Sequence, residues 1–287
     1  MQSPFKFLDS YTKEDRHLFF GRDAEIEELY HKIFESKILL VYGISGTGKT
    51  SLINCGLANK FNDSDWLPIN IRRGSNINES WLKNIERNAI TPVKTENLKK
   101  AVKSLYLDHF KPVYFIFDQF EELFIFGTKQ EKTEVVKNIK ILTEADIQCR
   151  FLIIMREEYL AGITEFEKEI PLILGNRVRI EKMTPGNAQQ AIEGPCRFAG
   201  ISIEENFSVN LLDKLNINRG EVELTYLQVF LDKVFRTAVS EDKSKIIFTK
   251  ILLGKLGDVS DILGSFLDEQ ISSLSDPETA LAILKSF

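Results

Sequence analysis

Cysteine and histidine are scarce in this 287-residue sequence, which contains three of each. Cys55, Cys149 and Cys196 lie far apart and form no C-x-x-C pair. We therefore expect three small, buried thiols in a reducing compartment, with neither a disulfide framework nor a cysteine metal site. The histidines are equally scattered, which argues against a zinc site.

Long hydrophobic runs and an excess of one charge are also missing. No apolar run approaches the 18 residues of a membrane helix, and the N-terminus lacks the basic-then-apolar pattern of a secretion signal. Lys and Arg total 37 against 42 Asp and Glu, a net charge of −5. No basic stripe marks a surface for a phosphate backbone. We expect a cytoplasmic protein, with no membrane partner and no indication of nucleic-acid binding.

Short apolar segments alternate with helical patterns in the first two thirds of the chain. The predicted strands are residues 38–42, 67–71, 112–117, 150–155 and 178–180. Helices are predicted between them, including one that begins near Asp23 and one over residues 129–143. This alternation predicts an α/β fold, a three-layer sandwich around a parallel five-stranded sheet.

A glycine-rich motif follows the first predicted strand. Residues 43–50 read GISGTGKT, which fits the phosphate-binding pattern G-x-x-x-x-G-K-[ST], and residues 51–58 can continue as a helix. Backbone N–H groups and a helix N-terminus then converge on phosphate oxygens. Lys49 would lie against the β- and γ-phosphates, and the Thr50 hydroxyl would coordinate Mg²⁺. The residues expected to hold the nucleotide here are Gly43, Ser45, Gly46, Thr47, Gly48, Lys49, Thr50 and Ser51.

Acidic residues follow the third predicted strand. Asp118 falls at its carboxyl end, where ligands bind in parallel sheets, and we assign it to Mg²⁺ through a coordinated water. The next residue is Gln119, where many ATPases have the glutamate that polarises water. Glu121 and Glu122 are the candidates for that role, with Glu121 preferred, although either could instead begin a solvated helix.

Arginines end two other predicted strands. Arg156 could contact the γ-phosphate from the fourth strand, or form a surface ion pair with Glu157 or Glu158. Arg72 and Arg73 follow the second strand and could face the γ-phosphate or a neighbouring subunit, but we assign them no role.

After residue 183 the pattern becomes mainly helical. Predicted helices cover residues 188–192, 209–215, 222–239 and 262–274, the first of them interrupted by Gly194-Pro195. We predict an aromatic-rich segment over residues 1–20, packed on the domain that follows. The other predicted domains are a phosphate-loop domain over 21–182, a helical lid over 183–240 and the start of a winged-helix-like domain over 241–287. The apolar C-terminal end suggests a piece of a longer protein.

Several motifs together resemble the STAND NTPases, most closely the bacterial novel STAND subgroup. They occur in family order from about Phe5 to the C-terminus. The matching stretches are FFGRDAE at 19–25, GISGTGKTSLI at 43–53, DQFEELF at 118–124, MREEYL at 155–160, AIEGP at 191–195 and LTYLQ at 224–228. Thr50 stands where serine is frequent in the subgroup, a conservative change for a Mg²⁺ ligand.

The resemblance implies roles for residues outside the loop. The Gly21-Arg22 turn and Pro195 would border the adenine of ATP or ADP. Family members are nucleotide-controlled switches that oligomerise with ATP once a sensor domain meets its trigger. They act through an attached effector, in many prokaryotes in antiviral defence or signalling. The resemblance therefore implies a homo-oligomer on activation, with sensor and effector parts outside this chain.

Other functions are compatible with the loop. One is a P-loop kinase that phosphorylates a small molecule, although no acceptor pocket is evident. Another is an AAA+-like remodelling motor, and a third is a pseudo-ATPase scaffold, which Gln119 keeps open. The absence of the guanine-reading N-K-x-D motif favours ATP over GTP. We expect slow hydrolysis by in-line water attack, with Lys49 and Mg²⁺ neutralising charge.

Overall fold

The computed structural model describes residues 3–215, 222–242, 245–256, 271, 272, 274 and 276–284. The chain forms two compact units. The sheet unit consists of Tyr11–Arg16 and Arg22–Glu181. The helical unit consists of Met1–Ser10, His17–Gly21 and Lys182–Phe287. The sheet unit ends at Glu181. The predicted domain boundaries after residues 20, 182 and 240 stay predictions.

A five-stranded parallel sheet is the centre of the sheet unit, as predicted. Its strands are β1 (Ile38–Gly43), β2 (Leu67–Ile71), β3 (Val113–Phe117), β4 (Cys149–Arg156) and β5 (Arg177–Arg179). Their order is β2-β3-β4-β1-β5, and all neighbours run parallel. The phosphate loop follows β1, next to β4, and the acidic segment follows β3 on the other side of β4. All these carboxyl ends therefore meet at one edge of the sheet.

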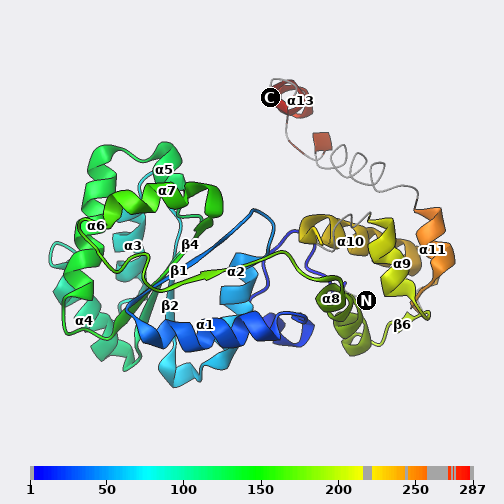
Figure 1. Ribbon diagram of the computed structural model, residues 1–287, viewed down its shortest axis with the longest axis horizontal. Helices are drawn as coiled ribbons and strands as arrows, with labels where there is room; N and C mark the ends of the chain where they lie inside the picture. Colours follow the sequence, from blue (N-terminus) through cyan, green and yellow to red (C-terminus); the bar gives the residue numbers. More distant parts are fainter. Residues whose placement is uncertain are drawn as a thin grey trace. The chain divides into compact units, whose positions relative to one another are not determined.

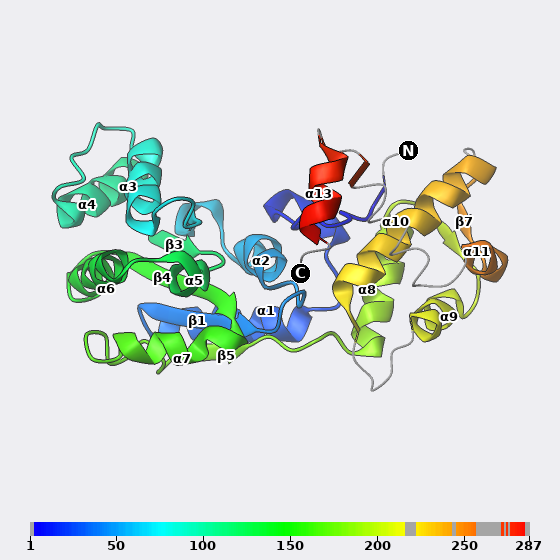
Figure 2. The same ribbon diagram turned by 90° about the horizontal axis from the view of Figure 1, so that it is seen from above.

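Helices cover both faces of this sheet, which is why β3 is buried along its whole length. One face carries α3 (Ile77–Asn88), α4 (Leu98–His109) and α6 (Lys129–Thr143), drawn at the left of Figure 1. Trp81 of α3 packs edge-on against Phe115 and Phe117 of β3. On the other side of the strands lies α1 (Asp23–Glu35), separated from α3 and α4 in the turned view of Figure 2.

Short helical pieces follow the strands. The phosphate loop leads into α2 (Lys49–Ser51), a π-helical segment (Leu52–Leu57) and a 3₁₀ turn (Ala58–Lys60), where we predicted one continuous helix. The acidic segment leads into α5 (Glu122–Phe126), and β4 leads towards α7 (Leu160–Ile163). Further 3₁₀ turns cover Lys13–Leu18, Asp63–Asp65, Glu157–Tyr159 and Thr164–Phe166.

The helical unit contains α8 (Pro185–Phe198), α9 (Phe207–Lys214), α10 (Leu224–Glu241), α11 (Lys250–Lys255) and α13 (Pro277–Leu284). Two short strands, β6 (Ser202–Ile203) and β7 (Ile247–Phe248), pair in parallel. The apolar stripe of α10 forms core: Leu227, Phe230, Leu231, Val234 and Phe235 are buried. The helix predicted over residues 262–274 lies mostly outside the described residues.

Two expectations for this unit were wrong. Helix α8 is not interrupted at Gly194-Pro195 but runs through both residues to Phe198. Proline removes one helical N–H donor, but here both residues are buried, so tertiary packing outweighs the local preference for a break.

The second correction concerns the N-terminal segment, which we expected to pack on the sheet domain. Phe5 is instead buried in the core of the helical unit, its ring centroid 6.3 Å from that of Phe248. Apolar burial against aromatic partners favours this placement. Tyr11–Arg16 does belong to the sheet unit, where the Tyr11 N–H donates to Ser51 Oγ at 3.1 Å.

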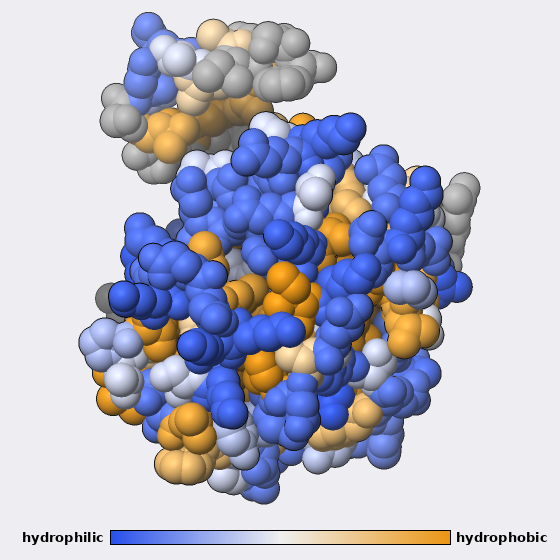
Figure 3. Space-filling model, turned by 90° about the vertical axis from the view of Figure 1, so that its left-hand side faces the viewer, coloured by the Kyte–Doolittle hydropathy of each residue, from blue (hydrophilic) through white to orange (hydrophobic). Residues whose placement is uncertain are grey.

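One face of the molecule can be followed in a space-filling view. The left-hand side of Figure 1, seen face-on in Figure 3, is mostly hydrophilic, with hydrophobic patches between hydrophilic residues. Among the residues that the structure describes, no helix has the length and apolar character needed to cross a membrane.

Candidate functional site

The phosphate loop wraps tightly at the end of β1, and its first glycine shows why. Gly43 has φ +154°, and a Cβ there would lie 2.3 Å from the Ile180 carbonyl oxygen. Any other residue would force the backbone apart. Beyond it, Ser45 and Gly46 are exposed, whereas Thr47 is buried and its Oγ1 donates to the Ile44 carbonyl at 3.1 Å. The loop is therefore ordered by its own contacts.

Lys49 opens α2 and points into this loop. Its Nζ donates to the carbonyl oxygens of Gly43 at 2.8 Å and Ile44 at 2.7 Å. Burial lowers the Lys49 pKa from its ordinary value, an effect partly offset by the negative charges of Glu121, Glu158 and Asp118. The ammonium is thus placed where phosphate oxygens would be drawn into the loop.

The predicted metal residues meet. The Thr50 hydroxyl donates to Asp118 Oδ1 at 2.9 Å, joining the start of α2 to the end of β3. Hydroxyl and carboxylate oxygens are the hard donors that Mg²⁺ takes, so this pair fits the ion. No cluster of three or more His, Cys, Asp or Glu suited to a metal occurs among the described residues. Phosphate and water oxygens would therefore have to complete the coordination.

Asp118 has a second partner that the sequence did not reveal. Arg72, the residue after β2, donates from Nε at 3.1 Å and from Nη2 at 2.7 Å to Asp118 Oδ2. The register explains the meeting, because Ile71 of β2 lies opposite Phe117 of β3. Only the position of Arg72 at a strand end could have signalled this role.

The candidate base is paired with the candidate phosphate-sensing arginine. Arg156 Nε lies 3.2 Å from Glu121 Oε1, and the Arg156 N–H donates to Glu121 Oε2 at 3.2 Å. The partner of Arg156 is thus Glu121, and not the neighbouring Glu157 or Glu158 that we considered. The Glu121 side chain is only 7% exposed and that of Arg156 48%. Glu122, which begins α5, is partly exposed.

Gln119 forms the turn of the backbone that follows Asp118. Its φ of +57° is in the left-handed region, which is uncommon for a residue with a side chain. The turn brings the Phe120 N–H to the Ile154 carbonyl at 2.9 Å and places Phe120 in the core. The chain therefore reverses directly after Asp118, and this reversal carries Glu121 back to β4.

Arg22 lies behind the loop with its side chain 3% exposed. Its Nη2 donates to the carbonyls of Thr47 at 3.0 Å and Glu181 at 3.2 Å, and Nη1 pairs with Glu25. These contacts make its guanidinium a brace of the loop, which the sequence did not predict. Gly21 and Pro195 belong to the helical unit, where Pro195 is buried. Their expected role beside adenine stays a prediction.

The fold and the loop together define a P-loop NTPase. The family model of novel STAND NTPase 1 matches residues 4–284, so this chain belongs to that family. No curated protein matches the chain. Nucleotide binding is supported for the family, and it agrees with the placement of Lys49, Thr50 and Asp118.

Solved structures agree in fold at low sequence identity. The Walker-type ATPase of Pyrococcus abyssi is 14% identical with a TM-score of 0.60, covering 94% of this chain and 80% of its own. The Aeropyrum pernix ORC2 protein, in its ADPNP–ADP complexes, is 15% identical with a TM-score of 0.63, covering 82% of this chain and 66% of its own. The Aeropyrum pernix ORC1 protein, in complex with DNA, is 14% identical with a TM-score of 0.60, covering 88% of this chain and 67% of its own.

Proposed function

We propose that this chain is an ATP-binding, slowly hydrolysing switch module whose nucleotide state controls oligomerisation and the activation of an effector. The observation that supports it best is the meeting of three strand ends. Lys49 and Thr50 follow β1, Asp118 and Glu121 follow β3, and Arg156 ends β4. Two cations, one hydroxyl and two carboxylates thereby meet at the edge where parallel sheets bind ligands.

In this proposal each residue acts on ATP in a defined way. Lys49 neutralises the β- and γ-phosphates, and its loop carbonyl contacts give way to phosphate oxygens. Mg²⁺, when bound, supplies further positive charge beside the phosphates, held by Thr50 and Asp118. Glu121 orients the attacking water, and Arg156 contacts the γ-phosphate.

The Glu121–Arg156 ion pair gives a reason for slow turnover. A carboxylate that accepts from the backbone N–H of Arg156 and is ion-paired with its guanidinium has less capacity to accept from water. In the proposed cycle Arg156 turns to the γ-phosphate, and Glu121 becomes able to hold water. A slow cycle suits a switch, because each nucleotide state must persist long enough to be read.

The resemblance to the family suggests a biological setting, which we include in the proposal. In this proposal the Gly21-Arg22 turn and Pro195 border the adenine. Sensor and effector parts lie outside this chain, and the module works in the cytoplasm in antiviral defence or signalling. Similarity to the solved structures shows the fold alone, so an AAA+-like motor is only an alternative. A pseudo-ATPase scaffold is the stronger of the two alternative functions, because Gln119 occupies the position after Asp118 and Glu121 is ion-paired.

The test measures ATP turnover in Mg²⁺ and, separately, molecular mass in ADP and in a non-hydrolysable ATP analogue. The proposal expects slow turnover that is abolished in Lys49→Ala, and a larger assembly with the analogue than with ADP. Binding without turnover would support the scaffold. Fast turnover with no dependence of mass on nucleotide would support a motor or another enzyme.

A further inference from the structure

Arg72 and Asp118 form the most exposed contact of the candidate metal site. The Arg72 side chain is 60% exposed, whereas that of Asp118 is 8% exposed. Neighbouring residues of β2 and β3 are in register up to Ile71 and Phe117, so the next residue of each strand emerges at the same edge. The buried carboxylate is fixed there, and the arginine reaches it from the solvent side.

The two carboxylate oxygens of Asp118 have different partners. Oδ1 accepts from the Thr50 hydroxyl, the residue that fits Mg²⁺. Oδ2 accepts from both Nε and Nη2 of Arg72. Two N–H donors occupy both lone pairs of that oxygen, so a further donor, such as a water on a metal ion, could reach Oδ2 only by displacing one.

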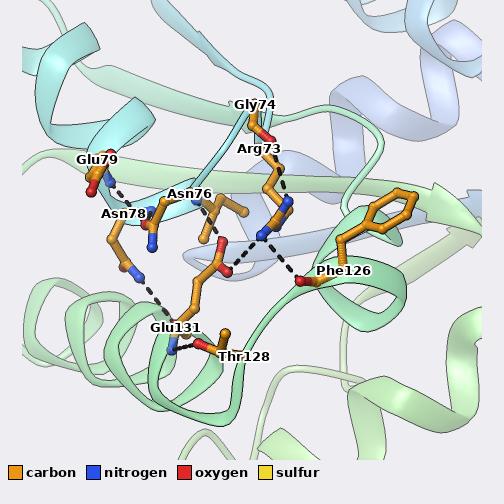
Figure 4. Close-up of polar contacts among 9 residues, drawn as sticks. Arg73, Gly74, Asn76, Asn78, Glu79, Phe126, Thr128 and Glu131 are labelled. Atoms are coloured by element: carbon orange, nitrogen blue, oxygen red, sulfur yellow. Dashed lines mark hydrogen bonds and ion pairs between the residues drawn. The ribbon is translucent and has the colours of Figure 1, made fainter.

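The neighbouring arginine fixes the backbone from which Arg72 extends. The Arg73 side chain has different partners from that of Arg72. Its Nη2 lies 2.9 Å from Glu131 Oε2 and 3.2 Å from the Phe126 carbonyl oxygen, as Figure 4 shows. The other Glu131 oxygen accepts from the Ile77 N–H at 2.7 Å. The end of β2 is thereby tied to the starts of α3 and α6.

The two neighbouring arginines have different roles: Arg73 holds the backbone at the end of β2, and Arg72 is able to move. Arg73 and Glu131 are 11% and 2% exposed, and their pair holds the backbone. Arg72 contributes little to holding it, because an ion pair with one largely exposed partner is worth little stability. Its guanidinium can therefore leave Asp118 at low cost while the strand end stays in place.

We propose that Arg72 is the resident counter-ion of Asp118 and that Mg²⁺ arriving with the nucleotide displaces it. A guanidinium and a divalent cation repel each other when both lie within a few ångströms of one carboxylate. Arg72 is then a positioning residue: it holds the metal carboxylate in place beforehand and weakens metal-dependent binding. This inference rests on the proposed nucleotide binding at the same site.

The experiment measures ATP and ADP dissociation constants by calorimetry, once with Mg²⁺ and once with EDTA. The quantity of interest is the ratio of the EDTA value to the Mg²⁺ value. Arg72→Met removes the charge and its hydrogen bonds at similar length, and Arg72→Lys keeps the charge. The matched control is Arg179→Met, which removes an arginine paired with Glu157 and Glu181 at the end of β5 without touching Asp118.

We expect the ratio to rise about three- to tenfold in Arg72→Met, the range for one partly exposed charged hydrogen bond. Arg72→Lys should stay near the wild-type ratio, and Arg179→Met should not change it. An unchanged or lower ratio in Arg72→Met, with wild-type nucleotide binding intact, overturns this inference alone. Absence of nucleotide binding in the wild type would overturn the proposed function as well.

Discussion

Glu121 and Arg156 are held together across two neighbouring strand ends, with Arg156 Nε 3.2 Å from Glu121 Oε1. The pair joins the residue proposed to orient water to the residue proposed to contact the γ-phosphate. Either residue can reach its proposed partner only by loosening this contact. The two side chains therefore cannot form this ion pair and take part in catalysis at the same time.

The first prediction separates the two candidate glutamates. Glu121→Gln should lower ATP turnover at least about a hundredfold, the usual contribution of a positioned base. Its nucleotide affinity should change little, because the amide keeps the shape. Glu122→Gln is the matched control and should stay within about twofold of wild type. Steady-state phosphate release measures both, and equal losses in the two variants would refute the assignment to Glu121.

The second prediction concerns Gly21, which has φ +79°. A Cβ there would lie 2.3 Å from the Asn187 carbonyl oxygen, within the helical unit. Gly21→Ala should destabilise the protein by about 2–4 kcal/mol, combining the left-handed backbone with overpacking. Gly200→Ala is the control, with φ +70° and nothing within 4 Å of its Cβ, and should cost only about 1–2 kcal/mol. Urea denaturation followed by circular dichroism gives both values, and similar losses would show that the close approach to Asn187 has no effect.

The third prediction is a pH dependence of stability. Burial acts to raise the Glu131 pKa, but hydrogen bonds from Arg73 and from the Ile77 N–H outweigh it and lower the pKa from its ordinary 4.5. A carboxyl whose folded pKa is depressed stabilises the fold fully above its unfolded pKa, and this contribution is lost as pH falls through the folded pKa.

Glu131→Gln should therefore cost roughly 3–5 kcal/mol near neutral pH, as for one partner of a buried pair. This difference from wild type should shrink below about pH 4.5. Glu169→Gln breaks the exposed pair with Lys140, 2.8 Å apart, and should leave stability nearly unchanged at every pH, because water screens this pair. Urea midpoints at several pH values test both, and a Glu131 effect that stays constant down to acid pH would contradict the account.

The fourth prediction concerns the three thiols. Burial raises the pKa of Cys149 to about 11 and the pKa of Cys55 and Cys196 to about 12 each. The reactive thiolate is then scarce at pH 8. A thiol reagent should label none of them within minutes in the folded protein and all three in urea, as counted by mass spectrometry. Rapid labelling of the native protein would contradict their burial.

Much of the fold could be predicted from local sequence patterns, each contained within one short segment. Four of the five strands could be predicted because each is a short, mainly apolar run, whereas β5 has one apolar residue between two arginines. The spacing of GISGTGKT placed the loop after the first strand. The meeting of Thr50 and Asp118 then follows, since the carboxyl ends of parallel strands share one edge.

The remaining features depend on contacts between distant segments. Long arginine side chains can reach several carboxylates. The pairing of Arg156 with Glu121 and of Arg72 with Asp118 could therefore be predicted only once the register of the sheet was known. Pro195 was misjudged because local preference was outweighed by burial, and Phe5 because its partner Phe248 is distant in sequence.

The most direct test of the central claim is the identity of the nucleotide that the purified protein holds, released by denaturation and separated by chromatography. We predict ADP or ATP at close to one per chain in the wild type, and much less in Lys49→Ala, whose loop lacks its phosphate-binding cation. Wild-type protein free of nucleotide, and unable to bind added ATP with Mg²⁺, would contradict it.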